Sequence, residues 1–353
     1  MIIKKISSFA ASIIKVFIVM FCLIINSKAN TNNNKYYSTD EGIISIMYHR
    51  FNENKYPSTN IQMDVFKKHV KIIKNLNYKF LNPNKFEETF NIPKKQKKVL
   101  LTIDDAFQSF YEEAWPFLKK EKIPFILFVS TEPVGKRGYM TWQQIKEIEK
   151  ENFTVIGHHS HSHEYMIDWN EADFVLDIEK SSSVFNKELG YIPALFSYPF
   201  GEYSEFMRNY ISKNFNYAFG QHSGVIDLNK EKFQLPRFPI NESYGEIKRF
   251  TSIINTFPLE YKNLLPNEKK ITKNNNPPIF EVEFFKNQNN LNNINCFSNE
   301  GNIWEKSETT IKNNILKIKF REPFKPRRGR VNCSLNDNGK WRWFGTQFTI
   351  KED

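Results

Sequence analysis

Short apolar runs alternate with amphipathic segments from residue 43 to residue 255, and this alternation restricts the possible folds most. The run GIISIMYH ends at His49, KKVLLTIDD ends at Asp105, and FTVIG ends just before a cluster of histidines. Between such runs lie segments with apolar residues at helical spacing, including TWQQIKEIEKE, whose first threonine is suited to cap a helix. Strands that alternate with helices predict a parallel α/β sheet or barrel, with the strand ends on one rim.

The amino-acid pattern changes near residue 256. Residues 259–278 are rich in proline, lysine and asparagine, and we expect them to form a linker after a first domain at 43–258. In residues 279–353, runs such as IFEVEFF and ILKIKF alternate apolar and polar side chains, which predicts a small all-β sandwich. Trp341 and Trp343 lie two apart on one predicted strand and share one side, which favours a contact between the domains over a carbohydrate-binding surface.

The first 29 residues have the features of an export signal. MIIKKISSF is basic, IIKVFIVMFCLII is apolar, and SKA, ending at Ala29, offers the small residues that a signal peptidase reads. A retained membrane anchor is the alternative, but Lys15 leaves fewer uninterrupted apolar residues than the about 20 that a span requires. We therefore expect a periplasmic or extracellular protein with no membrane span after cleavage, and a polar segment at 30–42.

The expected export also decides which cysteines remain in the mature protein. Cys22 would leave with the signal, so Cys296 and Cys333 remain as an even pair in an oxidising compartment. We expect these two residues to form a disulfide that joins the sheets of the sandwich.

The charge of the 353-residue chain argues against one class of partner. The formal net charge is +11, and +7 remains without the four lysines that precede residue 30, where no acid occurs. The positive charge is scattered, with no long basic block interleaved with aromatic residues, so nucleic-acid binding is not expected. A net charge of this sign suits an anionic envelope or polymer surface.

Four of the seven histidines stand in GHHSHSH, residues 157–163. His159 and His163 share a face if this segment forms a helical turn, and His161 joins them if it is extended. Two imidazoles and one carboxylate make a three-ligand site with an open position for water, which is typical of catalytic zinc. Asp104 and Asp105 supply carboxylates after a predicted strand, although this pair alone would also suit a helix cap. The carboxylates favour catalysis over a metal-storage tract.

These segments resemble the motifs of the polysaccharide deacetylase family, also called the NodB-homology or carbohydrate esterase 4 group. TIDDA is similar to the first motif, usually T-F-D-D-G; HSHSH, which reads H-[ST]-x-x-H, is similar to the second; FSYPFGEY is similar to the third, usually R-x-P-Y-G. The similarity spans residues 43–255. It implies a distorted (β/α)7-type barrel before the sandwich, and a divalent metal, expected to be zinc. It also implies hydrolysis of acetyl groups, expected to be N-acetyl, on an envelope or extracellular polysaccharide.

The resemblance also implies roles for single residues. Asp104 would be the general base, a backbone N–H near Phe200 would hold the oxyanion, and the metal would be bound by Asp105, His159 and His163.

Two departures from the family pattern affect the other catalytic groups. Ser197 stands where the third motif usually has an arginine, and Arg237, in LPRFP, is the expected substitute cation beside Asp104. The family's last motif usually has a histidine, but no histidine follows residue 240. We expect His222 to be the general acid, with His49 as the other candidate; His49 could also line the site or donate a structural hydrogen bond.

Two other functions stay open at this point. One is a sugar-binding protein on the same scaffold with weakened catalysis, and the other is a glycoside hydrolase that uses Asp104 and another carboxylate. The sequence predicts no oligomeric state. His69, on the predicted helix VFKKHVKIIKNL, is expected to face solvent.

Overall fold

The computed structural model describes residues 40–91, 96–286, 288 and 290–351. The predicted signal segment 1–29 lies outside the described residues, as does most of the polar segment 30–42. Within the described ranges, no helix is both long enough and apolar enough to cross a membrane.

A parallel sheet forms the centre of the first domain, and all the strand pairs recorded in it are parallel. In spatial order its described strands are β10 (Phe238–Pro239), β1 (Ile43–Tyr48), β5 (Lys98–Asp104), β6 (Phe125–Val129), β7 (Thr154–His158), β8 (Leu195–Ser197) and β9 (Tyr217–Phe219), with β4 (Lys79–Phe80) beside β5. Leu235, three residues before β10, bridges Phe219 of β9. The same segment therefore contacts both edges of the sheet, which gives the expected distorted (β/α) barrel.

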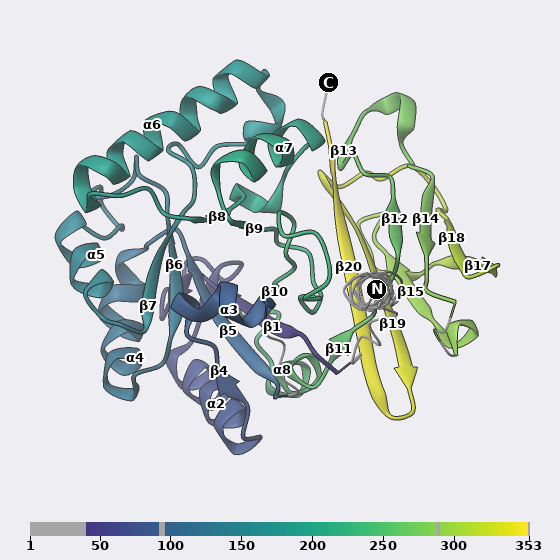
Figure 1. Cartoon of the computed structure of the whole chain (residues 1–353), viewed down its shortest axis with the longest axis horizontal. Coiled ribbons are helices and arrows are strands. Elements are labelled where there is room, and N and C mark those ends of the chain that lie inside the picture. The colour runs from purple at the N-terminus through teal and green to yellow at the C-terminus, as the bar shows by residue number, and fades with distance from the viewer. Residues whose placement is uncertain (1–39, 92–95, 287, 289, 352–353) are drawn as a thin grey trace, which may run out of the picture. The chain divides into compact units, whose positions relative to one another are not determined.

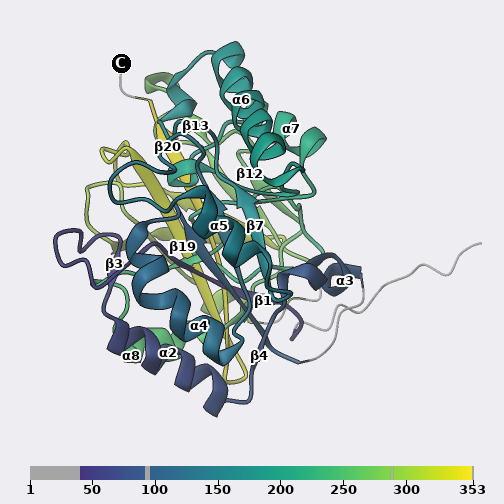
Figure 2. The ribbon, with the colours of Figure 1, turned by 90° about the vertical axis from the view of Figure 1, so that its left-hand side faces the viewer.

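Helices cover the outside of this sheet (Figures 1 and 2), except α3 (Phe86–Asn91), whose Phe86 and Phe90 pack in one cluster with Phe219 of β9. The described helices are α2 (Met63–Asn75), α3, α4 (Trp115–Glu121), α5 (Trp142–Glu149), α6 (Glu171–Leu189), α7 (Glu205–Asn214) and α8 (Ile247–Ile254), with a π-helical turn η2 (Phe110–Ala114) before α4. Thr141 caps α5 with a full capping box, as its sequence predicts, and Asn170 and Ser204 cap α6 and α7. Short helical turns occupy the connections η1 (Pro83–Lys85), η3 (Met166–Asp168) and η4 (Pro199–Gly201).

The two faces of the central strands enter different apolar clusters. On β5, Leu101 and Ile103 pack with the helices, whereas Leu100 packs with Phe128 and Phe219 in the cluster inside the barrel. Side chains alternate along a strand, so Asp104, at the end of β5, belongs to the inward-facing set. The apolar core therefore places this carboxylate inside the barrel mouth.

Residues 257–350 form two packed sheets, which is the expected sandwich (Figure 1). The larger sheet contains β11 (Phe257–Pro258), β20 (Lys340–Ile350), β19 (Arg328–Asp337), β15 (Asn295–Ser298), β16 (Glu305–Lys306) and β13 (Lys270–Ile271). The smaller sheet contains β12 (Asn263–Leu265), β14 (Phe280–Glu283), β18 (Ile315–Lys319) and β17 (Glu308–Lys312). Phe280 and Leu316 of the smaller sheet share one core with Val331 and Phe348 of the larger sheet. A separate two-stranded sheet, β2 (Arg50–Phe51) and β3 (Asn60–Ile61), follows β1.

Residues 259–278, expected to be a linker, belong to the sandwich. Their strand β12 pairs with β14, and their strand β13 pairs with β20. These strands are hard to recognise in a polar segment because each is only two or three residues long, and the partner of β13 lies far away in the sequence.

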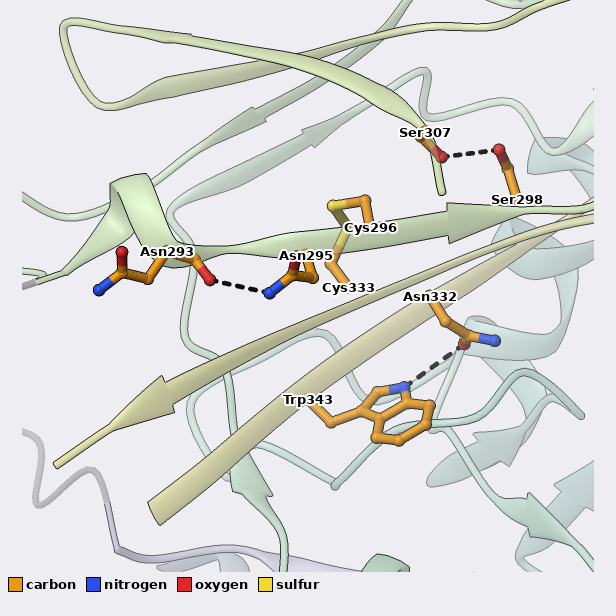
Figure 3. Close-up of a disulfide and its surroundings, with 8 residues drawn as sticks. All are labelled: Asn293, Asn295, Cys296, Ser298, Ser307, Asn332, Cys333 and Trp343. Atoms are coloured by element: carbon orange, nitrogen blue, oxygen red, sulfur yellow. Dashed lines mark hydrogen bonds between the residues drawn. A yellow bond between two sulfur atoms is a disulfide. The ribbon is translucent and has the colours of Figure 1, made fainter. Parts of the chain in front are cut away.

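Cys296 and Cys333 form the expected disulfide, but it does not join the two sheets. The two residues lie opposite each other on the neighbouring antiparallel strands β15 and β19 of one sheet (Figure 3). Both are completely buried, so the bond ties two core strands together beneath the interface between the sheets.

The prediction that His69 faces solvent is wrong. Its ring is fully buried and stacks on Phe250 at 3.8 Å between ring centroids. Nδ1 lies 3.0 Å from the Tyr48 hydroxyl and Nε2 lies 2.8 Å from the Gly245 carbonyl oxygen. The outer helix is covered here by α8, which the helical periodicity of α2 alone does not reveal.

We expect this histidine to make stability depend on pH. Burial lowers the pKa of His69 from 6.5 to about 4. The unfolded chain therefore binds a proton at His69 more tightly than the folded chain does. The contribution of the neutral buried ring to the free energy of unfolding is fully present above pH 6.5 and is lost as the pH falls towards 4. Between pH 7 and pH 5 the loss is about 2 kcal/mol. When the pH falls from 7 to 5, the free energy of unfolding measured in urea should decrease by about 2 kcal/mol less in His69→Gln than in the parent protein. Equal decreases in the two proteins would contradict this assignment.

Candidate metal centre

The residues singled out in the sequence follow the carboxyl ends of the parallel strands. His49 follows β1, Asp105 follows β5, His159 follows β7 and Phe200 lies just beyond β8. The carboxyl ends of parallel barrel strands meet at one rim, so four separate segments contribute to one site.

Asp105, His159 and His163 converge at this rim. Each offers one ligand atom, and the three atoms lie within 4.8 Å of one another. Asp105 Oδ1 is 3.3 Å from His159 Nε2 and 3.1 Å from His163 Nε2. The structure thus brings together the three residues that the sequence analysis assigns to a metal.

The hydrogen bonds of His159 direct one ring nitrogen towards this cluster. Its Nδ1 lies 2.7 Å from the Ser197 carbonyl oxygen, a geometry in which Nδ1–H donates and Nε2 keeps its lone pair. Among the described residues, His159 Nε2 and Asp105 Oδ1 are both buried without a hydrogen-bond partner. Buried polar atoms are rarely left unpaired, and two imidazoles with one carboxylate are a donor set typical of zinc. The residues present therefore fit a divalent cation.

Unusual backbone conformations hold the ligands in place. Asp105 and His163 have φ values of 75° and 57°, and Ala106 has 53°. A left-handed backbone conformation costs free energy in any residue that has a Cβ atom, and residues in this conformation are often found at functional sites. The loop is fixed by Asp177, whose carboxylate accepts the backbone N–H groups of His161 and Ser162 at 2.7 and 3.0 Å.

Asp104 and Arg237 form a fully buried ion pair beside the cluster. The guanidinium donates to both carboxylate oxygens, at 2.7 and 2.8 Å, and also to the Ser197 hydroxyl at 2.8 Å. Burial alone would raise the pKa of Asp104, but the charge and the hydrogen bonds of Arg237 outweigh it and hold the pKa below its ordinary value. Arg237 thus lies where the sequence analysis expects the substitute for the missing family arginine, and it keeps Asp104 ionised.

The four histidines in residues 157–163 have different surroundings, and only His159 and His163 belong to the metal cluster. His158 is buried in the core among Phe185, Phe196 and Phe215. His161 Nδ1 lies 2.8 Å from the Thr131 hydroxyl.

His49 and His222, the two candidate acids, line different cavities. His49 lines a cavity of about 510 Å³ together with Asp105 and His163, and its buried Nδ1 has no hydrogen-bond partner among the described residues. Burial lowers the pKa of His49, and the charges of Asp105 and Asp104 act in the opposite direction. His222 lines a separate cavity of about 490 Å³. The structure therefore does not bring His222 to the metal cluster.

The reason is the direction of successive side chains. Gln221 and Ser223, on either side of His222, line the cavity of the metal cluster, while His222 points to the other side of the same segment. Burial also lowers the pKa of His222 to about 3, so the ring is neutral. The sequence alone does not show which way this segment turns.

Phe200 forms part of the wall beside the cluster. Its ring lies 4.7 Å from that of His163 and stacks on Tyr165 at 4.2 Å. Gln347 of the sandwich donates to the Phe200 carbonyl oxygen at 3.2 Å.

Sequence reasoning missed several residues that line this cavity. They are Tyr165 and Tyr244 of the barrel domain, and Trp304, Arg328, Arg330 and Asn332 of the sandwich. Among the sandwich residues that line the cavity, only Trp343 carried a signal in the sequence, as one of two tryptophans on one strand face. It contacts the barrel residue Phe238, with 5.8 Å between ring centroids, as the expected contact between domains requires.

Residues 91–219 match the family model for polysaccharide deacetylases. A poly-β-1,6-N-acetyl-D-glucosamine N-deacetylase of Staphylococcus aureus is 25% identical over 210 residues, which cover 54% of this chain and 72% of that protein.

Two solved structures share the fold. The Streptococcus pyogenes deacetylase PplD superposes with a TM-score of 0.54 at 22% identity, covering 60% of this chain and 98% of that one. IcaB from Ammonifex degensii superposes with a TM-score of 0.54 at 24% identity, covering 61% and 97%. Both likenesses concern the fold alone.

The geometry of the cluster predicts that the protein binds a metal ion. After chelation and dialysis, the protein should bind one Zn²⁺ per chain in a calorimetric titration. His163→Gln should weaken this binding at least about 100-fold, because it removes one of three ligands. The matched control is His161→Gln, two residues away but outside the cluster, which should bind Zn²⁺ as the parent does. Equal effects of the two substitutions would show that the three residues do not share an ion.

Proposed function

Since this chain belongs to the polysaccharide deacetylase family through its residues 91–219, we propose that it is a metal-dependent hydrolase that removes N-acetyl groups from an extracellular or envelope glycan. The observation that carries this proposal is the convergence of Asp105, His159 and His163 beside the Asp104–Arg237 pair. A bound divalent cation, for which zinc is the expected identity, would supply water of lowered pKa and polarise the acetyl carbonyl.

Asp104 is the proposed general base. Its Oδ2 lies 3.9 Å from His159 Nε2, so the carboxylate stands next to the ligand atoms without being part of their cluster. Arg237 keeps it ionised and fixes both of its oxygens. An oriented carboxylate of this kind can accept the proton of an attacking water.

His49 is the proposed general acid, in place of His222. It shares the cavity with Asp105 and His163, and its buried Nδ1 has no hydrogen-bond partner among the described residues. Proton delivery to the departing amine nitrogen requires a donor in this cavity, and His222 lies outside it. Phe200, in its left-handed conformation beside His163, would place a backbone N–H near the acetyl oxygen.

Export of the protein is part of the same proposal. The expected signal at residues 1–29 and the Cys296–Cys333 disulfide both suit an oxidising compartment outside the cytoplasm. A polymeric glycan substrate in the periplasm or outside the cell would be accessible there.

The test is acetate release from a panel of acetylated glycans, including β-1,6- and β-1,4-linked N-acetylglucosamine oligomers. We expect release that stops on chelation and returns with Zn²⁺. Asp104→Asn should lower kcat by about 10²–10⁴-fold, because it removes the base, while Zn²⁺ binding persists and shows that the variant is folded. Metal binding without acetate release from any glycan would instead favour a sugar-binding protein, and chain cleavage that resists chelation would favour a glycoside hydrolase.

The choice of acid has its own test. His49→Gln should lower kcat on an acetamido sugar by about 10²–10⁴-fold, and His222→Gln should have a much smaller effect. On an aryl acetate, whose leaving group departs without a proton, the loss in His49→Gln should be much smaller. If His49→Gln lost the same factor on both substrates, or if His222→Gln showed the larger loss, the assignment to His49 would be wrong.

A further inference from the structure

One wall of the cavity above the metal cluster comes from the sandwich. Trp304, Arg328, Arg330, Asn332 and Trp343 line it opposite His49, Asp105 and His163 of the barrel. The second domain is therefore part of the cavity that the proposed substrate must enter.

Three kinds of contact fix this wall to the barrel. Glu202, two residues after Phe200, is almost fully buried and accepts hydrogen bonds from Arg327 and Arg328 at 2.8–3.0 Å. Gln347 donates to the carbonyl oxygens of Phe200 and Gly201, both at 3.2 Å. At Gly345, an added Cβ would lie 2.3 Å from the Ser223 carbonyl oxygen, so β20 approaches the barrel backbone too closely for any side chain. The wall is thus built into the site.

The cavity continues onto the surface of the sandwich. A second cavity of about 260 Å³ shares Trp304, Asn332 and Trp343 with the first and adds Phe297. Trp304 and Phe297 are each 41% exposed, a large fraction for such side chains. Exposed aromatic residues that border a functional cavity mark a binding surface.

Polar groups along this path remain available to a ligand. The Trp343 indole N–H donates to the Asn332 amide oxygen at 3.4 Å (Figure 3), and the structure shows no partner for the amide nitrogen of Asn332 among the described residues. Arg330 is partly buried, and its Nε donates to Gln347 at 3.0 Å; no carboxylate pairs with it in the described part of the chain. Amide and guanidinium donors beside flat apolar faces match a sugar, which has hydroxyl and acetamido oxygens at its edges and C–H groups on its faces.

We propose that the sandwich supplies a subsite for sugar units that neighbour the deacetylated unit on the same glycan chain, with Trp304 and Phe297 as stacking platforms and Asn332 and Arg330 as donors. Sugar units of the same glycan are the proposed occupant because this surface is continuous with the cavity of the metal cluster. This inference rests on the proposed function, and it makes the substrate a chain several sugars long.

The test compares chain lengths. For the parent, kcat/KM on acetylated oligomers should rise from dimer to hexamer. In Trp304→Ala, the hexamer-to-dimer ratio of kcat/KM should fall about tenfold, through KM on the hexamer, because stacking contributes to binding of the distant sugars. Phe297→Ala should lower the ratio in the same direction.

Trp341→Ala is the matched control. Trp341 is 49% exposed and lies on the same strand as Trp343, but it lines neither cavity. It should keep the parent's ratio. An unchanged ratio in Trp304→Ala, or the same change in Trp341→Ala, overturns the subsite.

A failure of the proposed function gives a different result. In that case no oligomer releases acetate, and the same variants are titrated calorimetrically with the acetylated hexamer. Weaker binding by Trp304→Ala than by Trp341→Ala would then support the subsite, and equal binding would overturn it.

Discussion

The buried ion pair between Asp104 and Arg237 is the interaction on which the site depends. Arg237 also donates to the Gly220 carbonyl oxygen and to the hydroxyls of Thr102 and Ser197, so one guanidinium ties β5, β8 and the segment after β9 together. Removing two charges from water costs several kcal/mol, and only a full set of hydrogen bonds offsets that cost. Because this set is complete for Arg237, the barrel closes around an ionised carboxylate, at the position where the proposed chemistry requires a base.

The second domain completes what the barrel begins. Its β19–β20 region contacts the turn after β8 through Glu202 and through the carbonyl oxygens of Phe200 and Gly201. This turn contains Phe200 in a left-handed conformation, which costs free energy unless surrounding contacts hold it. The sandwich therefore supports the wall of the metal cluster and lines the cavity above it. A deacetylase built in this way would recognise its glycan with both domains.

The histidines show how tertiary structure assigns chemistry to similar side chains. His158 and His159 are neighbours in sequence, yet the strand alternation sends the first into an aromatic core and the second towards Asp105. His69 has an ordinary amphipathic helix around it, and packing against α8 makes it a buried neutral base. In each case the partner that decides the role lies far away along the chain.

Periodicity and motif spacing were enough to predict the alternation of strands and helices, the sandwich strands after residue 279, and the grouping of Asp105, His159 and His163. These features depend on periodicity and on spacing within a motif, which neighbouring residues encode. Long-range packing places His49, and not His222, in the cavity of the metal cluster. It also pairs residues 259–278 with strands of the sandwich and keeps the disulfide within one sheet. It also decided that Trp304 and Arg330 line the cavity. These outcomes depend on which side of a segment faces which distant partner, and that choice is made by the packing of the whole chain.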